Sequence, residues 1–388
     1  MFITILAFII VLGIIVMVHE LGHFFTARIF KVKVEEFGLG FPPRLAGFYK
    51  GKSGKRKWLW GSKFKSEEAP NTIYSLNKIP IGGFVKIKGE DGGGGGDDDS
   101  FVNKPAWQRS IILSAGVAGN ILLCIMLLAI GYSVGLPTVV EDEVLRNVKS
   151  VSDTKIQVVS INSASPAETA GFQIGDAILS LDSSEVETIA EINDFTEKKD
   201  NLLMNVKIKR GGEILSLEVI PRVLETSNNK AVMGVGLVKT AIVSYKWYEA
   251  IWQGLLNTFY ILGAIVEALW LLIKNIFTTG EVSTELAGPV GIAVLTGQVV
   301  KLGWIYVLQF AALLSLNLGI INILPFPALD GGRLLFILIE RIRGKEINKR
   351  VENIVHTIGF AILMVAIVFV TYRDIVRWGG QIVSRLSS

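Results

Sequence analysis

Long apolar runs constrain the fold of this chain more than any other feature. They extend over residues 2–18, continuing through Phe25, and over about 110–136, 303–339 and 354–372. Each approaches or exceeds the roughly 20 residues that an α-helix needs to cross the hydrocarbon core of a bilayer. Half of the 388 residues are hydrophobic and 19% are charged, which is too apolar for an ordinary soluble domain. We therefore expect a polytopic α-helical membrane protein with about four transmembrane helices.

The first run is expected to stay in the protein as a transmembrane helix. A secretory signal peptide carries a basic leader and a small-residue cleavage site. The run that begins at Phe2 shows neither, and it continues into a polar motif instead of a cleavage site. We therefore interpret it as a retained span.

Basic residues predict how the spans are oriented. Lysine and arginine are frequent in residues 31–106 and again in the link from Glu340 to Arg350. Such loops stay on the cytoplasmic face of a membrane. The amino terminus, residues 137–304 and the carboxyl terminus are then expected outside. The net charge of +4 is small for this chain length and does not indicate a nucleic-acid partner.

Residues between the second and third spans divide into a soluble part and a helical part. Residues 155–222 alternate short β-branched strands with turns, which predicts a small soluble domain. Residues 247–277 are a candidate apolar helix that either spans the membrane or lies in its interface. A single crossing there would move Asp330 toward the opposite leaflet from His19, so an interfacial or re-entrant placement is favoured.

These patterns predict four segments along the chain. The first holds two spans and a cytoplasmic loop with a membrane-associated β-hairpin, and the second is the soluble domain. The third holds interfacial amphipathic helices, and the fourth holds two further spans. Their expected limits are residues 1–136, 137–225, 226–302 and 303–388.

The motif His-Glu-x-x-His at residues 19–23 is the strongest indication of function. His19 and His23 stand on one face of a helix about one turn apart, so both imidazoles can reach one zinc ion. Glu20 is then placed to act as general base toward a water on the metal. The alternative is that these are polar residues at a helix end, satisfied by lipid headgroups or by His356. His356 itself is interpreted as an interfacial residue without a metal role.

Asp330 is the best candidate for the third protein ligand that a catalytic zinc site requires. Few acidic residues lie within the apolar runs, and Asp330 follows Pro325 and Pro327 in the long third run. The prolines break helical geometry, and irregular backbone at membrane depth is tolerated where it lines a polar cavity. Gly331 and Gly332 allow close backbone approach after the aspartate. The alternative is that Asp330 only caps a helix at the break.

A peptidase acting inside a membrane must hold its substrate extended, because a transmembrane helix offers no free carbonyl groups to attack. Residues 82–89 alternate like a strand between glycines and could present an edge for β-addition around Gly83 and Phe84. Asn317 and Asn322 supply side-chain amides near the break. The alternatives are an ordinary amphipathic hairpin and helix-packing hydrogen bonds, respectively.

Two further features have structural interpretations. Cys124 is the only cysteine, which excludes disulfide scaffolding, and its apolar surroundings favour a packing role over catalysis. Residues 92–96 are glycines and are followed by Asp97 to Asp99, which predicts a flexible acidic linker. A calcium loop is not expected because the spacing of calcium ligands does not follow.

Taken together, the motifs resemble those of the site-2 protease family, in particular the bacterial regulators of envelope-stress signalling that cleave anti-sigma factors within the membrane. The resemblance covers nearly the whole chain. It rests on the histidine motif and on five other segments, which are residues 82–84, 101–109, 287–292, 317–322 and 329–332.

This resemblance implies zinc as the cofactor, with His19, His23 and Asp330 as ligands and Glu20 as the catalytic residue. It implies substrate-binding roles for the strand of Gly83 and Phe84 and for the two asparagines. The external α+β domain is similar to a single PDZ domain through residues 165–176, where some relatives have two in tandem. Paired-domain filtering of substrates is therefore not expected.

The resemblance also implies a location and partners. The protein is expected in the bacterial inner membrane, with the PDZ domain on the extracytoplasmic side. Expected partners are the lipid bilayer and single-pass membrane substrates, of the anti-sigma-factor or signal-peptide kind, with a peptide C-terminus or substrate at the PDZ domain. Two other functions stay open: a membrane-anchored PDZ scaffold with a vestigial zinc site, and a metal transporter. An intact Glu20 disfavours the scaffold, and the lack of internal symmetry disfavours the transporter.

Overall fold

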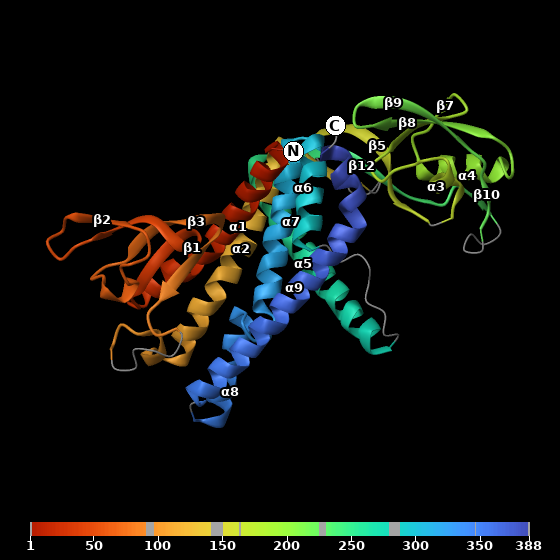
Figure 1. Ribbon diagram of the computed structural model, residues 1–388. Helices are drawn as coiled ribbons and strands as arrows, with labels where there is room; N and C mark the ends of the chain where they lie inside the picture. The colour runs from red at the N-terminus through yellow and green to blue at the C-terminus, as the bar shows by residue number, and fades with distance from the viewer. Residues whose placement is uncertain are drawn as a thin grey trace. The chain divides into compact units, whose positions relative to one another are not determined.

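The computed structural model describes residues 2–90, 97–140, 150–162, 164–224, 230–278, 288–345 and 347–386. The chain forms two compact units (Figure 1). The core unit comprises residues 1–128 and 253–388, and the inserted unit comprises residues 129–252. The predicted division into four segments is finer than this. Its limit between residues 225 and 226 is corrected below, and the other limits stay predictions.

Helices form most of the core unit. Within the described residues, five of them are long and apolar enough to cross a membrane: Ile3–Ile29, Ala106–Val134, Trp247–Asn275, Trp304–Ile323 and Lys349–Arg377. Many of their large apolar side chains are exposed, among them Val365 and Phe369. Such a surface is unfavourable in water and suits hydrocarbon. The helices are α1 (Phe2–Ile29), α2 (Ala106–Val134), α5 (Trp247–Thr278), α6 (Pro289–Leu302), α7 (Trp304–Ile323), α8 (Asp330–Arg343) and α9 (Lys349–Leu386).

Contacts between helices show the direction in which each one runs. Helix α2 runs antiparallel to α1, since Gly119 lies against Val18 and the carbonyl of Ile112 contacts His23. Helix α7 runs antiparallel to α2, because Ser315 donates to the carbonyl of Asn120 and Gly319 lies beside Val117. Helices α1 and α7 are therefore parallel (Figure 1).

The third apolar run is interrupted where the two prolines predicted a break. Helix α7 ends at Ile323 and α8 begins at Asp330. Gly331 and Gly332 allow the chain to fold back at this point. A Cβ added to Gly331 would lie 2.2 Å from the carbonyl oxygen of Ile323, and one added to Gly332 would lie 2.3 Å from that of Phe326. The expected close backbone approach is confirmed.

A bent antiparallel sheet follows α1. Its strands are β1 (Val34–Lys50), β2 (Arg56–Trp60) and β3 (Ile73–Ile87), in the order β2-β1-β3, with short 3-10 helices at Ser66–Glu68 and Phe101–Asn103. The carboxyl-terminal arm of β3 pairs Gly83 with Leu39 and Phe84 with Gly38 of β1. This arm lies at the edge of the sheet, so the strand predicted around Phe84 is confirmed and has an edge position.

The inserted unit is built on a sheet with the strand order β4-β12-β5-β6-β8-β9, with β7 paired to β6. Its core contains Ile156 and Val158 from β5, Leu181 from β6, Ile192 from α4 and Val206 from β8. The elements are β4 (Leu136–Val139), β5 (Ser150–Ile161), α3 (Pro166–Thr169), β6 (Ala177–Leu181), β7 (Ser184–Glu185), α4 (Ile189–Lys198), β8 (Met204–Arg210), β9 (Glu213–Val219), β10 (Arg222–Val223), β11 (Ala231–Val232) and β12 (Val235–Ser244).

Two expectations need correction. Residues 231–244 were expected in a segment of interfacial helices, but they form β11 and β12, and β12 is paired on both sides in the large sheet. Tertiary pairing decides this, because a β-rich stretch completes the sheet of the inserted unit. Asp97 and Asp99 are not a free linker: both form ion pairs with Lys88, and these hydrogen bonds raise the pKa of Lys88. The glycines at 92–96 lie outside the described residues.

Candidate metal centre and active site

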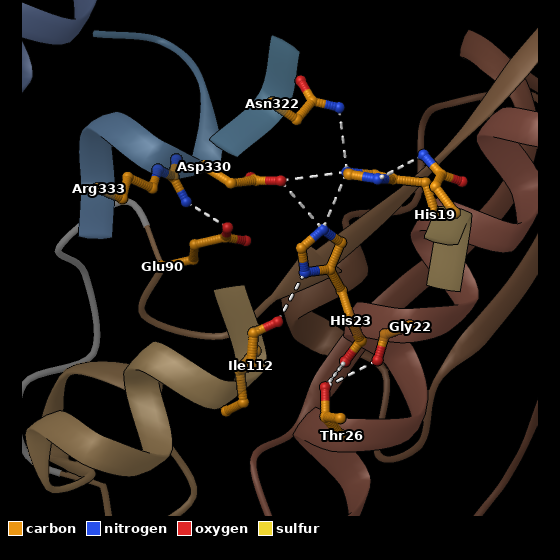
Figure 2. A network of polar contacts seen from close by, with 10 residues as sticks. His19, Gly22, His23, Thr26, Glu90, Ile112, Asn322, Asp330 and Arg333 are labelled. Carbon is orange, nitrogen blue, oxygen red and sulfur yellow. Dashed lines mark hydrogen bonds and ion pairs between the residues drawn. The ribbon is translucent and has the colours of Figure 1, made fainter. Parts of the chain in front are cut away.

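Three potential metal ligands converge beside the break between α7 and α8 (Figure 2). His19 and His23 come from one face of α1, and their Nε2 atoms are 3.2 Å apart. The Asp330 Oδ2 atom lies 3.1 Å from Nε2 of His19 and 3.3 Å from Nε2 of His23. Both histidines are 6% exposed. The predicted ligand set is thus brought together from residues more than 300 positions apart.

The spacing of these atoms fits one zinc ion. A tetrahedral zinc with nitrogen and oxygen ligands at about 2.0 to 2.1 Å needs ligand atoms about 3.3 to 3.4 Å apart. The observed separations are 3.1 to 3.3 Å. Two imidazoles and one carboxylate are also the donor types that catalytic zinc sites use. The site can therefore hold zinc with little rearrangement.

Hydrogen bonds to the outer ring nitrogens orient the histidines. Nδ1 of His23 donates to the carbonyl of Ile112 at 2.8 Å, which leaves the lone pair of Nε2 facing the site (Figure 2). Nδ1 of His19 lies 3.3 Å from Nδ2 of Asn120, whose buried Oδ1 atom has no partner among the described residues. Turning the Asn120 amide over would let His19 donate to Oδ1 and free its Nε2 for the metal.

Glycines let α2 approach the ligands closely. A Cβ on Gly116 would lie 2.4 Å from Nε2 of His23 and 2.7 Å from Cε1 of His19. A Cβ on Gly22 would lie 2.2 Å from the carbonyl oxygen of Ala115. Both contacts are far shorter than real Cβ atoms make, so glycine is required at this crossing. Gly116 and Asn120 were not identified from the sequence, although a small-xxx-polar pattern on an apolar helix could have indicated them.

Asp330 is held at the start of α8 by the turn that precedes it. Ala328 in this turn has a φ of +76°, a conformation that non-glycine residues rarely adopt. The backbone N–H of Ala328 donates to Nδ1 of His356 at 2.9 Å, so α9 braces the turn. His356 is not one of the converging ligands within the described chain. Its position at the break is more specific than the interfacial role that we predicted.

Glu20 lies between the ligand group and the edge of β3. A Cβ on Gly83 would be 3.8 Å from Cγ of Glu20, so the Glu20 side chain lies against this strand. The adjoining loop is tied to α8 by an ion pair between Glu90 and Arg333 (Figure 2). A carboxylate, a metal-ligand group and a strand edge therefore meet in one place.

The two predicted asparagines occupy different positions. Nδ2 of Asn322 lies 3.4 Å from Nε2 of His19, so Asn322 belongs to the site (Figure 2). Nδ2 of Asn317 donates to the carbonyl of Leu313 within its own helix and lies outside the ligand group. Cys124 is buried, with Sγ 3.5 Å from Oγ1 of Thr258, and stands apart from the ligands.

Apolar helices that enclose two histidines, an aspartate and a glutamate define a membrane-embedded metallopeptidase, and comparison with known proteins agrees. The sequence model of Peptidase family M50 matches residues 7–366. A protein of Fusobacterium nucleatum is 31% identical over 378 residues, which cover 96% of this chain and 98% of that protein. The zinc metalloprotease RasP of Oceanobacillus iheyensis is 30% identical over 459 residues, covering 96% of this chain and 99% of RasP.

The chain therefore belongs to Peptidase family M50, the site-2 protease family. The predicted family and the predicted class of enzyme, a metalloprotease, are confirmed. Among solved structures, the PDZ domain of an SdrC-like protein from Listeria monocytogenes is similar, with 18% identity and a TM-score of 0.21. The match covers 23% of this chain and 92% of that domain.

Proposed function

We propose that this protein is an intramembrane zinc metalloendopeptidase that hydrolyses transmembrane segments of single-pass membrane proteins. The observation that carries the proposal is the convergence of His19, His23 and Asp330 beside Glu20, inside apolar helices. Ionisable groups are costly in such surroundings, and their presence there marks function. Relatives named zinc metalloproteases support zinc as the metal.

The three ligands would hold zinc, with Glu20 as the catalytic base. Bound zinc supplies a Lewis acid that polarises the scissile carbonyl and makes water a better nucleophile at neutral pH. Glu20 takes a proton from the attacking water and passes it to the leaving amine. Asn120 and Ile112 orient the imidazoles, and Asn322 supplies a donor beside the reacting carbonyl.

The edge of β3 would hold the substrate. A peptide extended along Gly83 and Phe84 can pair with the free side of the strand, which keeps its carbonyl groups accessible near Glu20. Glycine at position 83 suits the close pairing of β3 with β1, because a Cβ there would meet the carbonyl oxygen of Gly38 at 3.0 Å. Asn317 could contact the substrate farther along α7.

The surroundings of the enzyme are proposed on the same basis. The enzyme lies in the bacterial inner membrane, with residues 31–106 in the cytoplasm and the inserted unit outside. The inserted unit acts as one PDZ domain that receives a peptide C-terminus or part of the substrate. Substrates are single-pass proteins of the anti-sigma-factor or signal-peptide kind.

Cleavage of a single-pass substrate by the purified full-length protein in detergent tests the proposal. Glu20→Gln should keep zinc and lower the rate by at least about 100-fold, since a general base contributes about 10² to 10⁴ in rate. Glu218→Gln, an exposed carboxylate of β9, is the matched control and should cleave normally. Chelation with 1,10-phenanthroline should abolish cleavage, and added zinc should restore it.

Zinc content measured by mass spectrometry separates the alternatives. Wild-type protein that binds zinc and cleaves no substrate would contradict the protease and favour the scaffold. Zinc flux into proteoliposomes without cleavage would favour the transporter.

A further inference from the structure

A basic cavity lies at the end of α1, apart from the metal centre. Its volume is about 480 Å³, within the range of small-molecule sites. Arg28 at the end of α1, Lys50 at the end of β1 and Arg56 at the start of β2 line it, with Phe48 and Tyr74 as an aromatic wall. Of the elements that form the metal site, α1 and the sheet also line this cavity.

The three cations are held close together without an internal counter-ion. The lining contains no carboxylate, and within the described residues none of the three forms an ion pair. Aromatic rings hold the two guanidinium groups instead: Arg28 lies 5.4 Å from the ring centroid of Phe24, and Arg56 lies 5.6 Å from that of Phe48. Clustered like charges create a positive potential that favours an anion.

Neighbouring residues place this cavity at the level of lipid headgroups. Arg28 stands in the last turn of a candidate span that ends at Ile29. Trp107, which is 58% exposed on the first turn of α2, packs edge-to-face against Phe30 at the same end of α1. Trp58 and Trp60 on β2 are 65% and 78% exposed. Tryptophan and arginine gather where the hydrocarbon meets the headgroups.

We propose that this cavity binds the phosphate of an anionic phospholipid, and that the hairpin of β1 and β2 is thereby fixed to the membrane surface. Arginine guanidinium groups match phosphate oxygens in pairs, and lysine adds a point charge. Free phosphate has the same chemistry, but the aromatic wall of the cavity and its position at the end of a candidate span suit a lipid. The site is separate from the proposed catalysis, and its binding can be measured without substrate.

Lipid binding to the full-length protein in detergent tests this inference. Native mass spectrometry would compare phosphatidylglycerol with phosphatidylcholine for wild type and for Lys50→Gln/Arg56→Gln. The control Lys52→Gln/Lys55→Gln removes the same charge from the same hairpin, outside the cavity lining. We expect the cavity variant to lose about 30-fold in phosphatidylglycerol affinity and the control to lose little. A 30-fold loss corresponds to about 2 kcal/mol, since about 1.4 kcal/mol is tenfold.

Four outcomes would overturn the proposal. Equal loss in both double variants would show diffuse attraction instead of a site, and equal affinity of wild type for both lipids would exclude selectivity. Inorganic phosphate that binds as tightly as the lipid would indicate a soluble ligand. If the cavity variant bound an acidic substrate peptide more weakly than wild type but bound phosphatidylglycerol equally well, the cavity would be assigned to substrate. Zinc content and thermal unfolding show whether each variant is folded. If the double variant fails to fold, Arg28→Gln repeats the test, with Lys31→Gln as its control.

Discussion

At the scale of single residues, the chemistry of the site depends on which ring nitrogen of each histidine carries a proton. The tautomer of His23 is fixed by its hydrogen bond to the Ile112 carbonyl, because a carbonyl oxygen can only accept. His19 depends on Asn120, whose amide can present either oxygen or nitrogen. Only the oxygen gives His19 the tautomer that binds a metal through Nε2.

We therefore expect Asn120→Leu to weaken zinc binding. Loss of a hydrogen bond to a metal-ligating histidine typically costs about 10- to 100-fold in metal affinity. Asn120→Asp should restore most of it, because a carboxylate accepts from Nδ1. Zinc affinity is measured by competition with a chelating dye, and Asn317→Leu on α7 serves as control. Unchanged zinc affinity in Asn120→Leu would show that Asn120 does not orient His19.

At the scale of elements, the site is assembled by the crossing of α1 and α2. Helices normally pack about 8 to 10 Å apart, and small residues allow closer approach. Gly22 and Gly116 face each other at this crossing, so each backbone contacts the other helix directly. The same contact brings the carbonyl of Ile112 within reach of His23.

Gly116→Ala should accordingly lower zinc affinity and protease activity together. Its methyl group would overlap His23, which must move out of the ligand group. Gly13→Ala is the matched control, because a Cβ at Gly13 meets nothing within 4 Å on the same bundle. The alanine at position 13 should bind zinc normally, since alanine favours a helix more than glycine does. Zinc stoichiometry at equal protein concentration checks both, and full occupancy in Gly116→Ala would contradict the packing argument.

At the scale of the whole molecule, helix direction limits how the core unit crosses the membrane. Helix α5 runs antiparallel to α2, because the N–H of Tyr245 just before α5 donates to the carbonyl of Tyr132 and Thr258 lies beside Cys124. Gly297 of α6 lies beside Thr4 at the start of α1. Helices α5 and α7 therefore both begin on the side where α1 begins. If α5 crossed the membrane alone, α6 and the residues before it would have to cross back. With 14 residues, α6 is only about 21 Å long, shorter than a bilayer core of about 30 Å.

A re-entrant or interfacial α5 predicts a labelling pattern. In a Cys124→Ser background, Thr278→Cys at the end of α5 should not react with an impermeant thiol reagent applied from the cytoplasmic side. Ser53→Cys in the hairpin of β1 and β2 should react from the cytoplasmic side. Asp200→Cys in the inserted unit should react from the extracytoplasmic side. If Thr278→Cys reacted from the cytoplasm as fast as Ser53→Cys, α5 would be a full span.

The sequence by itself determined the features that depend on neighbouring residues. The four-residue spacing of His19 and His23 is a property of any helix, and apolar length indicates membrane spans before any tertiary contact is known. Pro325, Pro327 and the glycines after Asp330 indicated the break in the same local way. These signals predicted which residues converge as candidate metal ligands and which carboxylate we propose as general base.

Only the tertiary structure decided what depends on partners distant in sequence. Asn120, Gly116 and His356 act through α1 or the turn before Asp330, and their own neighbours in sequence do not indicate those contacts. The edge position of Gly83 follows from pairing with β1, and β12 became a strand because the inserted unit supplied strands on both of its sides. The physical reason is that hydrogen bonding and close packing across long separations select among local conformations that the sequence leaves nearly equal in free energy.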